Sequence, residues 1–380
     1  MPATEERDGW QIRRVPATGV VPGTPSAVRD GRGAPTQAWW LARYLAAIRA
    51  WTARTSGLAC RDADGGDGPV VWHGHDLPGL AAAVRARRRS GGEGAVVYDS
   101  HELFVEAGSA ALLPPPARRL LSRYERRLAG SAAAVVTVND SIAGELSRRL
   151  GVGAPTVVMN CPPVGTWPLL GRDESPLRAL LPSPRSRAVL YHGALSPHRG
   201  VETAVEALDR LPLDVVLVVV GDGPLSGWLK AEAERRPSRL VVHPAVPLGE
   251  LPRWVAGTDV GLVVFEPVNR NNCLATPNKL FECLASGVPV VASAFPEMTR
   301  VVEGTGGGVT CPPGDPAALA DAVLALLDEP VPERMARRHR CRRAAEARFN
   351  WERESSKLVR LYGQVAGQPG RFLPRPDGSS

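Results

Sequence analysis

The chain has 380 residues, of which 44% are hydrophobic and 22% are charged, so it is long enough to form two α/β domains with separate cores. It contains no run of about 18 apolar residues, and its first residues lack the apolar segment of a signal peptide, so we expect a cytoplasmic protein. The formal net charge of +7 is modest, and no basic motif with interleaved aromatic residues accompanies it, which disfavours a nucleic-acid partner.

The cysteines bear on redox state and on metal binding. The six cysteines are scattered along the chain without a CxxC pair. This spacing favours reduced thiols over disulfides or a cysteine-based zinc site.

The N-terminal part of the chain shows little regular pattern. Residues 1–37 contain no clear succession of strand, glycine loop and helix, and the segment 9–16 (GWQIRRVP) predicts at most one short strand. Residues 19–35 are rich in Gly and Pro and predict a loop. A helix is predicted over Ala38–Thr55.

Apolar runs and helical patterns then alternate, which predicts a parallel sheet with right-handed crossovers. We assign residues 1–165 to this first, Rossmann-like domain. The predicted strands are Val70–Trp72, Ala95–Tyr98, Ala134–Val138 and Thr156–Met159, and the predicted helices are Leu77–Ser90, Ala117–Gly130 and Ser141–Leu150.

Two loops that follow strands of this domain hold histidines. The first is HGHD, with His73, His75 and Asp76, and the second is DSHE, with Asp99, His101 and Glu102. Side chains beyond the carboxyl ends of parallel strands face the ligand. Neither loop has the ligand spacing of a zinc site, so we predict no metal here. A general-base role for one histidine and a hydrogen-bonding role towards sugar hydroxyls both remain open.

The predicted helix within residues 114–130 (PPPARRLLSRYERRLAG) is basic and amphipathic. Five arginines lie beside Leu120, Leu121 and Leu128. Such a helix suits an anionic membrane surface, so peripheral contact with the inner face of a membrane stays open beside a simply solvated basic face. Through Arg185 the chain has 23 basic and 17 acidic residues, so most of its positive charge lies in this half.

A proline-rich linker over residues 166–187 leads to a second alternation over 188–345, the predicted donor domain. Residues 346–363 form a helix expected to return to the first domain, and residues 364–380 are expected to be a disordered tail. The predicted strands are Ala188–Tyr191, Val215–Val220, Leu240–His243, Val260–Phe265, Val288–Ala292 and Gly308–Thr310, and the predicted helices are Val201–Leu211, Leu225–Arg236, Leu248–Ala256, Pro316–Leu327, Pro332–Phe349 and Trp351–Gly363.

Two glycine-containing loops follow strands of the second domain. Gly193 and Gly200 bracket a loop in which Arg199 is a charged donor suited to a diphosphate. Gly223 belongs to a GxG turn, which by itself indicates only a tight turn.

A further helix, between the strands near 260 and 290, combines a helix start with charged residues. Thr276 is the predicted N-cap and Pro277 the first helical residue, which places Asn278 and Lys279 in the first turn, where free N–H groups attract an anion. Glu282 follows about one turn later. An anion on the amides and a carboxylate beyond it suit the phosphates and the ribose of a nucleotide.

The segment PNKLFECLASGVPVV (277–291) resembles the PNKxFE motif of retaining family 4 glycosyltransferases, and WHGHDLPGL with VVYDSHELF resembles a HxHDLP and YDSHE signature of the same family. The resemblance covers about Val70 to Gly363. It implies the GT-B fold of two Rossmann-like domains, with ribose held by Glu282, the diphosphate at the helix N-terminus, and His101 on the acceptor side of the reaction centre.

Two positions depart from the family pattern. Leu274 stands where many members carry a second glutamate near the donor sugar, and Ala194 stands where an arginine is usual, while Arg199 matches the family's lysine. Asn271, Asn272 or Glu266 are alternatives for the sugar contacts.

We therefore predict three groups of site residues and no cofactor. The predicted catalytic residues are His101, Arg199, Lys279 and Glu282; the donor-binding residues are Gly193, Gly223, Asn272, Asn278 and Leu280; the acceptor-side residues are His73, His75, Asp76 and Glu102.

The resemblance implies a metal-independent retaining transfer of a hexose from a UDP- or GDP-linked sugar to a hydroxyl acceptor. Two alternatives remain: a non-catalytic nucleotide-sugar-binding or partner protein, and a nucleotide-sugar epimerase of the same fold. Because a Rossmann-like domain normally begins with a strand and a glycine loop, we also expect the first domain to lack these elements and the chain to start late.

Overall fold

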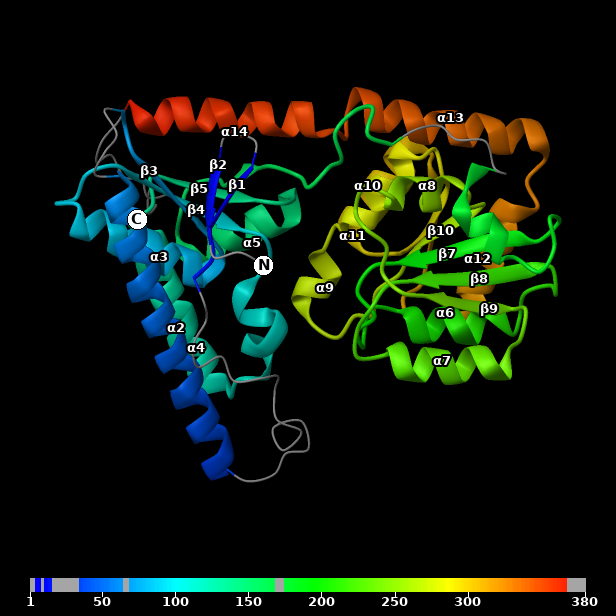
Figure 1. Ribbon diagram of the computed structural model, residues 1–380, viewed down its shortest axis with the longest axis horizontal. Helices are drawn as coiled ribbons and strands as arrows, with labels where there is room; N and C mark the ends of the chain where they lie inside the picture. The colour runs from blue at the N-terminus through cyan, green and yellow to red at the C-terminus, as the bar shows by residue number, and fades with distance from the viewer. Residues whose placement is uncertain (1–3, 8–9, 16–33, 64–67, 168–173, 368–380) are drawn as a thin grey trace, which may run out of the picture. The chain divides into compact units, whose positions relative to one another are not determined.

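The computed structural model describes residues 4–7, 10–15, 34–63, 68–167 and 174–367, and the chain divides into two compact units (Figure 1). The first unit comprises Met1–Thr137, Ala143–Thr156 and Val359–Ser380, and the second comprises Val138–Ile142 and Val157–Leu358. Each unit is built on a sheet of parallel strands with helices packed on it, so the predicted class of two Rossmann-like domains is confirmed.

The first unit has a four-stranded sheet in the order β3-β4-β5-β6. Strand β4 pairs in parallel with β3 and with β5, and helix α2 packs against α3 (Figure 1). The strands are β3 (Val71–His75), β4 (Ala95–Ser100), β5 (Ala134–Thr137) and β6 (Thr156–Val157); the helices are α2 (Ala34–Ala63), α3 (Asp76–Arg89), α4 (Pro115–Ala129) and α5 (Asp140–Leu150), with short 3-10 helices η1 (Phe104–Glu106) and η2 (Gly108–Leu112).

The N-terminal segment forms a hairpin that was only half predicted. Strand β2 (Trp10–Arg13) lies within the predicted segment 9–16 and pairs antiparallel with β1 (Thr4–Arg7). Strand β1 was missed because its sequence, TEER, has no apolar alternation. Helix α2 is longer than predicted at both ends and runs from Ala34 to Ala63. Residues 16–33 lie outside the described part of the chain.

The second unit has a six-stranded parallel sheet in the order β12-β11-β10-β7-β8-β9. The strands are β7 (Arg187–His192), β8 (Val215–Val220), β9 (Leu240–His243), β10 (Val260–Val263), β11 (Val290–Ser293) and β12 (Gly308–Cys311). The helices are η4 (Pro176–Leu180), α6 (Val201–Leu208), α7 (Ser226–Arg235), α8 (Leu251–Ala256), α9 (Arg270–Leu274), α10 (Asn278–Ala285), α11 (Pro296–Thr305), α12 (Pro316–Leu327), α13 (Val331–Ala347) and α14 (Trp351–Ala366).

Alternate residues of the buried strands feed two cores, one on each face of this sheet. Ala188 and Leu190 pack in the core beneath α8, α10, α11 and α13, whereas Val189 and Tyr191 pack in the core beneath α6 and α12. Strand order reverses at β7, which has β8 on one side and β10 on the other. Such a switch point is where open parallel sheets bind ligands.

The predicted start of α10 is wrong by one residue. Thr276 lies one residue before the N-cap, and its hydroxyl oxygen accepts a hydrogen bond from Asn139 Nδ2 at 2.9 Å. Pro277 is extended and precedes the helix, which begins at Asn278. Helix α9 was missed because it has only five residues, although Asn269 caps it by accepting from the Asn272 amide at 2.8 Å.

Several smaller predictions are also settled. All six cysteines are free thiols, as predicted. Helix α14 continues to Ala366, so the predicted tail begins too early, and residues 368–380 lie outside the described part. No helix in the described ranges is both long and apolar enough to cross a bilayer.

Strand β3 and helix α3 approach each other so closely that Gly74 has no room for a side chain. A Cβ built on Gly74 would lie 2.5 Å from the carbonyl group of Gly79. We predict that Gly74→Ala destabilises the protein by about 1–3 kcal/mol, as overpacking does. Denaturation with urea, followed by circular dichroism, measures this change.

The matched control is Gly144→Ala in α5, where nothing lies within 4 Å of an added Cβ. That variant should be neutral or more stable by up to about 1 kcal/mol, because alanine is the better helix former. Equal midpoints for Gly74→Ala and wild type would contradict the close approach.

Candidate functional site

The carboxyl ends of β7 and β10 form the first group of candidate site residues. The loop after β7 runs from Gly193 to Gly200, both with positive φ (115° and 75°). A Cβ on Gly200 would lie 2.9 Å from Val264, so the two segments meet at this switch point. A side chain at Gly193 would be strained by its backbone conformation, which favours glycine there.

Two predicted catalytic cations meet over one aromatic ring. The guanidinium carbon of Arg199 lies 4.7 Å from the centre of the Phe265 ring, and Lys279 Nζ lies 5.8 Å from the same centre and 3.7 Å from that of Tyr191. Desolvation, followed by repulsion from Arg199, lowers the pKa of Lys279 to about 7. Two neighbouring cations at a helix N-terminus form a site suited to an anion.

Glu282 is held by a histidine that the sequence analysis did not select. Glu282 Oε2 lies 2.8 Å from His192 Nε2, and the buried His192 Nδ1 has no hydrogen-bond partner among the described residues. The bond fixes the carboxylate one turn beyond the start of α10. The sequence feature that could have indicated His192 is its position at the end of β7, directly before Gly193.

Glu282 and Asn278 also line a pocket of about 360 Å³ in the second unit. Asn278 is exposed and is the first residue of α10, which places it at the helix start as predicted. The remaining lining residues are Asn160, Cys161, Pro162 and Trp351. The pocket is therefore mostly polar and adjoins the helix N-terminus.

Three predicted donor residues have mainly structural contacts. Gly223 packs against the loop after β7, where an added Cβ would lie 2.4 Å from the Leu195 carbonyl oxygen. Asn272 donates to the carbonyl oxygens of Glu266 (3.2 Å) and His198 (3.4 Å), which ties α9 to the same loop. The Leu280 side chain is fully buried in the core.

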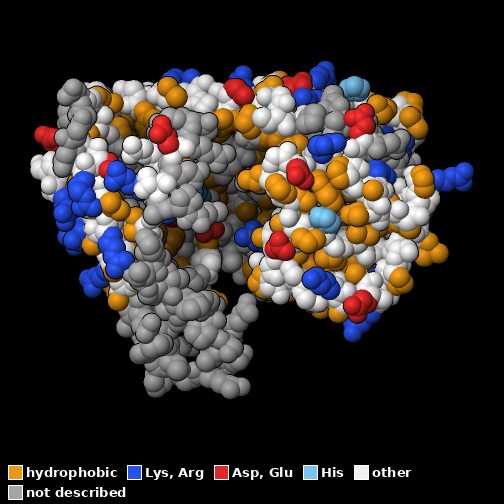
Figure 2. Space-filling model, viewed as in Figure 1, with side chains coloured by type: hydrophobic (Ala, Val, Ile, Leu, Met, Phe, Trp, Pro, Cys, Tyr) orange, Lys and Arg blue, Asp and Glu red, His pale blue; other side chains and the backbone are white. Residues whose placement is uncertain are grey.

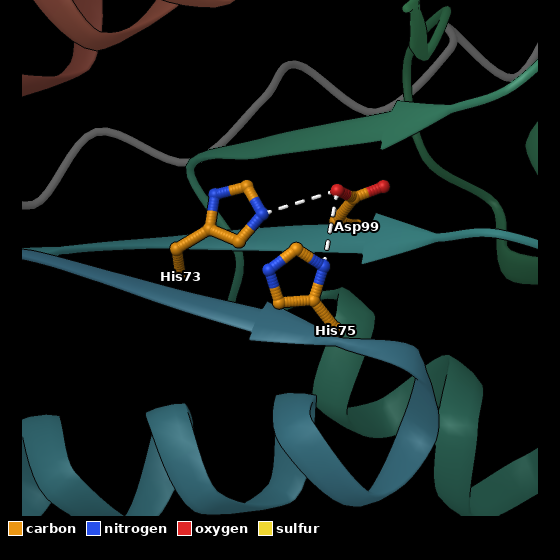
Figure 3. A group of neighbouring side chains, drawn as sticks. All are labelled: His73, His75 and Asp99. Atoms are coloured by element: carbon orange, nitrogen blue, oxygen red, sulfur yellow. Dashed lines mark hydrogen bonds and ion pairs between the residues drawn. The ribbon is translucent and has the colours of Figure 1, made fainter. Parts of the chain in front are cut away.

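The second group of candidate residues gathers in the first unit, where β3 and β4 end (Figure 3). His73 Nε2, His75 Nδ1 and His101 Nε2 lie 3.2, 3.3 and 3.3 Å from Asp99 Oδ2. His73 and His75 are two residues apart on β3, so their side chains point to the same face of the sheet. Asp99 of β4 pairs in register with His75, so its side chain points to that face too. Asp76 Oδ1 accepts from the backbone N–H of His101 at 3.2 Å.

Burial, hydrogen bonds and charges within this group shift the pKa values of three of its side chains. Burial opposes ionisation of Asp99, but hydrogen bonds from the three histidines hold its pKa well below the usual range. The bond to Asp99 raises the pKa of His101, and the nearby Asp76 and Glu102 add to that effect. Burial raises the pKa of Asp76. The group is centred on a carboxylate and therefore suits hydroxyl donors or cations, not anions.

Tyr362 and Asp99 belong to this group but were absent from the predicted site residues. Tyr362 on α14 lies with its hydroxyl oxygen 2.7 Å from His73 Nδ1. No local pattern links residues 289 positions apart, so the sequence held no signal for this contact. Asp99 had a signal, because it lies two residues before His101 at the end of a predicted strand.

Two family models match the chain. One, "Glycosyl transferase 4-like domain", covers residues 2–163, and the other, "Glycosyl transferases group 1", covers residues 186–329. A similar protein is the glycogen synthase of Mycobacterium tuberculosis, 27% identical over 270 residues that cover 68% of this chain and 60% of that protein. The D-inositol 3-phosphate glycosyltransferase of Xylanimonas cellulosilytica is 31% identical over 269 residues, 67% of this chain and 61% of that protein. The matched stretch spans less than two thirds of either relative.

Solved structures are similar in fold. HepE of Anabaena in complex with UDP has a TM-score of 0.67 at 18% identity, covering 83% of this chain and 82% of that one. Sucrose-phosphate synthase from Thermosynechococcus elongatus has a TM-score of 0.70 at 20% identity, covering 97% of this chain and 86% of that one. The fold is therefore of the GT-B type, as the resemblance implied.

The lowered pKa of Lys279 predicts that diphosphate binding takes up a proton. Lys279 is largely neutral above pH 7, and a bound anion restores its charge, so affinity for UDP or GDP should fall as pH rises from 7 to 9, by up to about tenfold per pH unit. Calorimetry in buffers with different ionisation enthalpies measures the proton uptake.

The matched variant is Lys279→Arg, whose guanidinium stays charged throughout this range. It should bind with little change of affinity between pH 7 and 9. The same pH dependence in the variant and in wild type would assign the effect to another group.

Proposed function

We propose that this chain, which belongs to the family of group 1 and 4-like glycosyltransferases, transfers a hexose from a nucleoside-diphosphate sugar to a hydroxyl acceptor, with retention of anomeric configuration. The donor is linked to UDP or GDP and is bound by the second unit. The acceptor is bound by the first unit, through the group around His101. The supporting observation is the pair of cations, Arg199 and Lys279, at the start of α10.

The chemistry of this proposal rests on charge stabilisation. As the glycosidic bond loosens, negative charge grows on the leaving diphosphate, and the two cations together with the first N–H groups of α10 stabilise it. These groups supply the stabilisation without a metal ion. Because leaving-group charge is greatest in the transition state, Arg199 and Lys279 act mainly on turnover.

Glu282 and His101 have separate roles in the proposal. Glu282, oriented by His192, accepts hydrogen bonds from the ribose hydroxyls. His101 and its neighbours His73, His75, Asp76 and Glu102 orient the acceptor, and the acceptor oxygen attacks the face that the diphosphate leaves. Gly193, Gly223 and Asn272 keep the donor loops in place.

A non-catalytic binding protein is the second candidate. Ala194 and Leu274 replace an arginine and a glutamate that the family resemblance leads one to expect. A chain that lost these groups retains a nucleotide site without efficient transfer. The third candidate is an epimerase, which would invert a stereocentre of the donor sugar and not transfer the sugar.

The test begins with UDP- and GDP-linked hexoses and the purified chain. We expect one donor to raise the thermal midpoint, to be hydrolysed slowly without acceptor, and to give a product with the anomeric configuration of the donor. Glu282→Ala should weaken binding of the matching nucleoside diphosphate by about 1.5–3 kcal/mol, the loss of a charged hydrogen bond. Calorimetry measures this change.

The other possible results of these assays distinguish the two alternative functions. Tight binding without any hydrolysis or transfer supports the binding protein, and a changed sugar in the recovered donor supports the epimerase. Glu333→Ala, an exposed glutamate on α13, is the matched control and should bind as wild type does. A folded Glu282→Ala variant with unchanged affinity excludes the ribose role.

We also propose that α4 brings the enzyme to an anionic membrane surface. Leu120 and Tyr124 are 67% and 46% exposed and lie one turn apart, flanked by the exposed Arg119, Arg123 and Arg127. Leu128, part of the face expected from the sequence, is buried instead. Arg side chains are also grouped on the surface of the first unit in Figure 2. Apolar side chains between arginines suit lipid headgroups.

Co-sedimentation with phosphatidylcholine vesicles, with and without phosphatidylglycerol, tests this contact. Binding should require the anionic lipid, fall with salt, and weaken by about 1 kcal/mol for each of Arg119→Gln and Arg123→Gln. The double variant Leu120→Ser/Tyr124→Ser should also lose binding. The control Leu248→Ser, which changes a leucine 84% exposed in the second unit, should not.

A further inference from the structure

Three side chains at the ends of β3 and β4 bring one ligand atom each close together (Figure 3). The ligand atoms of His73, His75 and Asp99 all lie within 4.8 Å of one another. His101 Nε2 joins them at 3.0 Å from His75 Nδ1 and 3.3 Å from Asp99 Oδ2. Two imidazole nitrogens and one carboxylate oxygen thus converge in the first unit, and a third imidazole nitrogen lies beside two of these atoms.

The distances match those between ligands of one metal ion. Nitrogen and oxygen ligands lie about 2.0–2.2 Å from Zn²⁺, so two ligands of the same tetrahedral ion lie roughly 3.3–3.6 Å apart, and slightly closer where the ligand–metal–ligand angle is smaller. The distances from the three histidines to Asp99 Oδ2 are 3.2, 3.3 and 3.3 Å. The atoms are therefore already spaced as neighbours in a coordination sphere.

Hydrogen bonds alone do not satisfy this arrangement. Asp99 Oδ2 has two lone pairs but three ring nitrogens within 3.3 Å. His75 Nδ1, His101 Nε2 and Asp99 Oδ2 also form a triangle, and each nitrogen carries at most one hydrogen, so at most two of its sides are hydrogen bonds. A cation at the centre would interact favourably with all of these atoms at once.

We propose that the chain binds a divalent transition metal ion, represented by Zn²⁺, through His73 Nε2, His75 Nδ1 and Asp99 Oδ2, with His101 Nε2 beside His75 and Asp99. Imidazole and carboxylate ligands suit Zn²⁺ and Co²⁺, whereas Mg²⁺ and Ca²⁺ prefer sites made of oxygen atoms. His75 and His101 have side chains 60% and 43% exposed, which gives an ion access from solvent.

Tyr362 fits the proposed site as a positioning residue. Its hydroxyl group lies 2.7 Å from His73 Nδ1, the ring nitrogen that does not face Asp99. With His73 Nε2 on the metal, Nδ1 carries the hydrogen and donates it to the tyrosine oxygen. A hydrogen-bond partner on the second nitrogen is a regular feature of metal-bound histidines because it fixes the ring.

Neither loop alone has a ligand-spacing motif, so the sequence pattern predicts no metal here. The site is made instead by strand register: HxH on β3 and DxH from β4 each place alternate residues on one face, and His75 pairs with Asp99. Metal binding by these residues does not depend on the proposed transfer reaction, and the experiments below measure binding directly.

The primary test titrates the EDTA-treated, dialysed full chain with Zn²⁺, Co²⁺ and Mg²⁺. We expect one Zn²⁺ per chain, visible absorption bands from bound Co²⁺, and no binding of Mg²⁺ at the same site. His75→Ala and Asp99→Asn should each weaken Zn²⁺ binding at least tenfold, and Tyr362→Phe by about tenfold. The control His339→Ala, an exposed histidine on α13, should leave binding unchanged.

X-ray absorption by the Zn²⁺-loaded wild-type chain provides a measurement that needs no variant. Scattering from two or three imidazole ligands supports the site, and scattering from one or none overturns it. Failure of the wild-type chain to take up Zn²⁺, or equal uptake by wild type and by folded His75→Ala and Asp99→Asn, also overturns the proposal.

Discussion

Parallel strand pairing is the constraint on which both groups of candidate residues depend. Parallel strands end at the same edge of a sheet, so segments far apart in the chain bring side chains together there. In the first unit the register of His75 with Asp99 places two histidines and a carboxylate on one face. In the second unit the adjacency of β7 and β10 brings Gly200 against Val264. Glycine at Gly74 and Gly200 is needed because neighbouring backbone comes too close for a side chain.

Aromatic rings stabilise the two cations of the second unit without adding an opposite formal charge. Phe265 is almost fully buried, yet its ring attracts both Arg199 and Lys279, and Tyr191 gives Lys279 a second ring. A carboxylate in this place would form a closed ion pair and leave no net charge for a ligand. Ring contacts add no opposite formal charge, while desolvation, followed by repulsion from Arg199, lowers the pKa of Lys279 to about 7. The same arrangement therefore explains both the anion site and its pH sensitivity.

The sequence predicted the features that rest on local pattern. Runs of β-branched residues located β8 and β9 at their observed bounds, and the PNK segment located the start of α10 to within one residue. The sequence did not predict features that depend on contacts between residues far apart in the chain. Threonine is a residue type favoured at N-caps, but the hydroxyl oxygen of Thr276 accepts a hydrogen bond from the distant Asn139. His192 and Tyr362 act through partners 90 and 289 positions away, and no periodicity encodes such pairs.

The two groups of residues differ in charge in a way that limits what each can bind. The group around Lys279 holds two cations near a helix N-terminus and attracts phosphate. The group around Asp99 has a carboxylate at its centre, and the low pKa of Asp99 keeps it ionised across the physiological range. A phosphate placed there would face that negative charge at close range, whereas hydroxyl groups or a metal ion would be stabilised by it. A phosphate is therefore better stabilised by the group around Lys279 than by the group around Asp99.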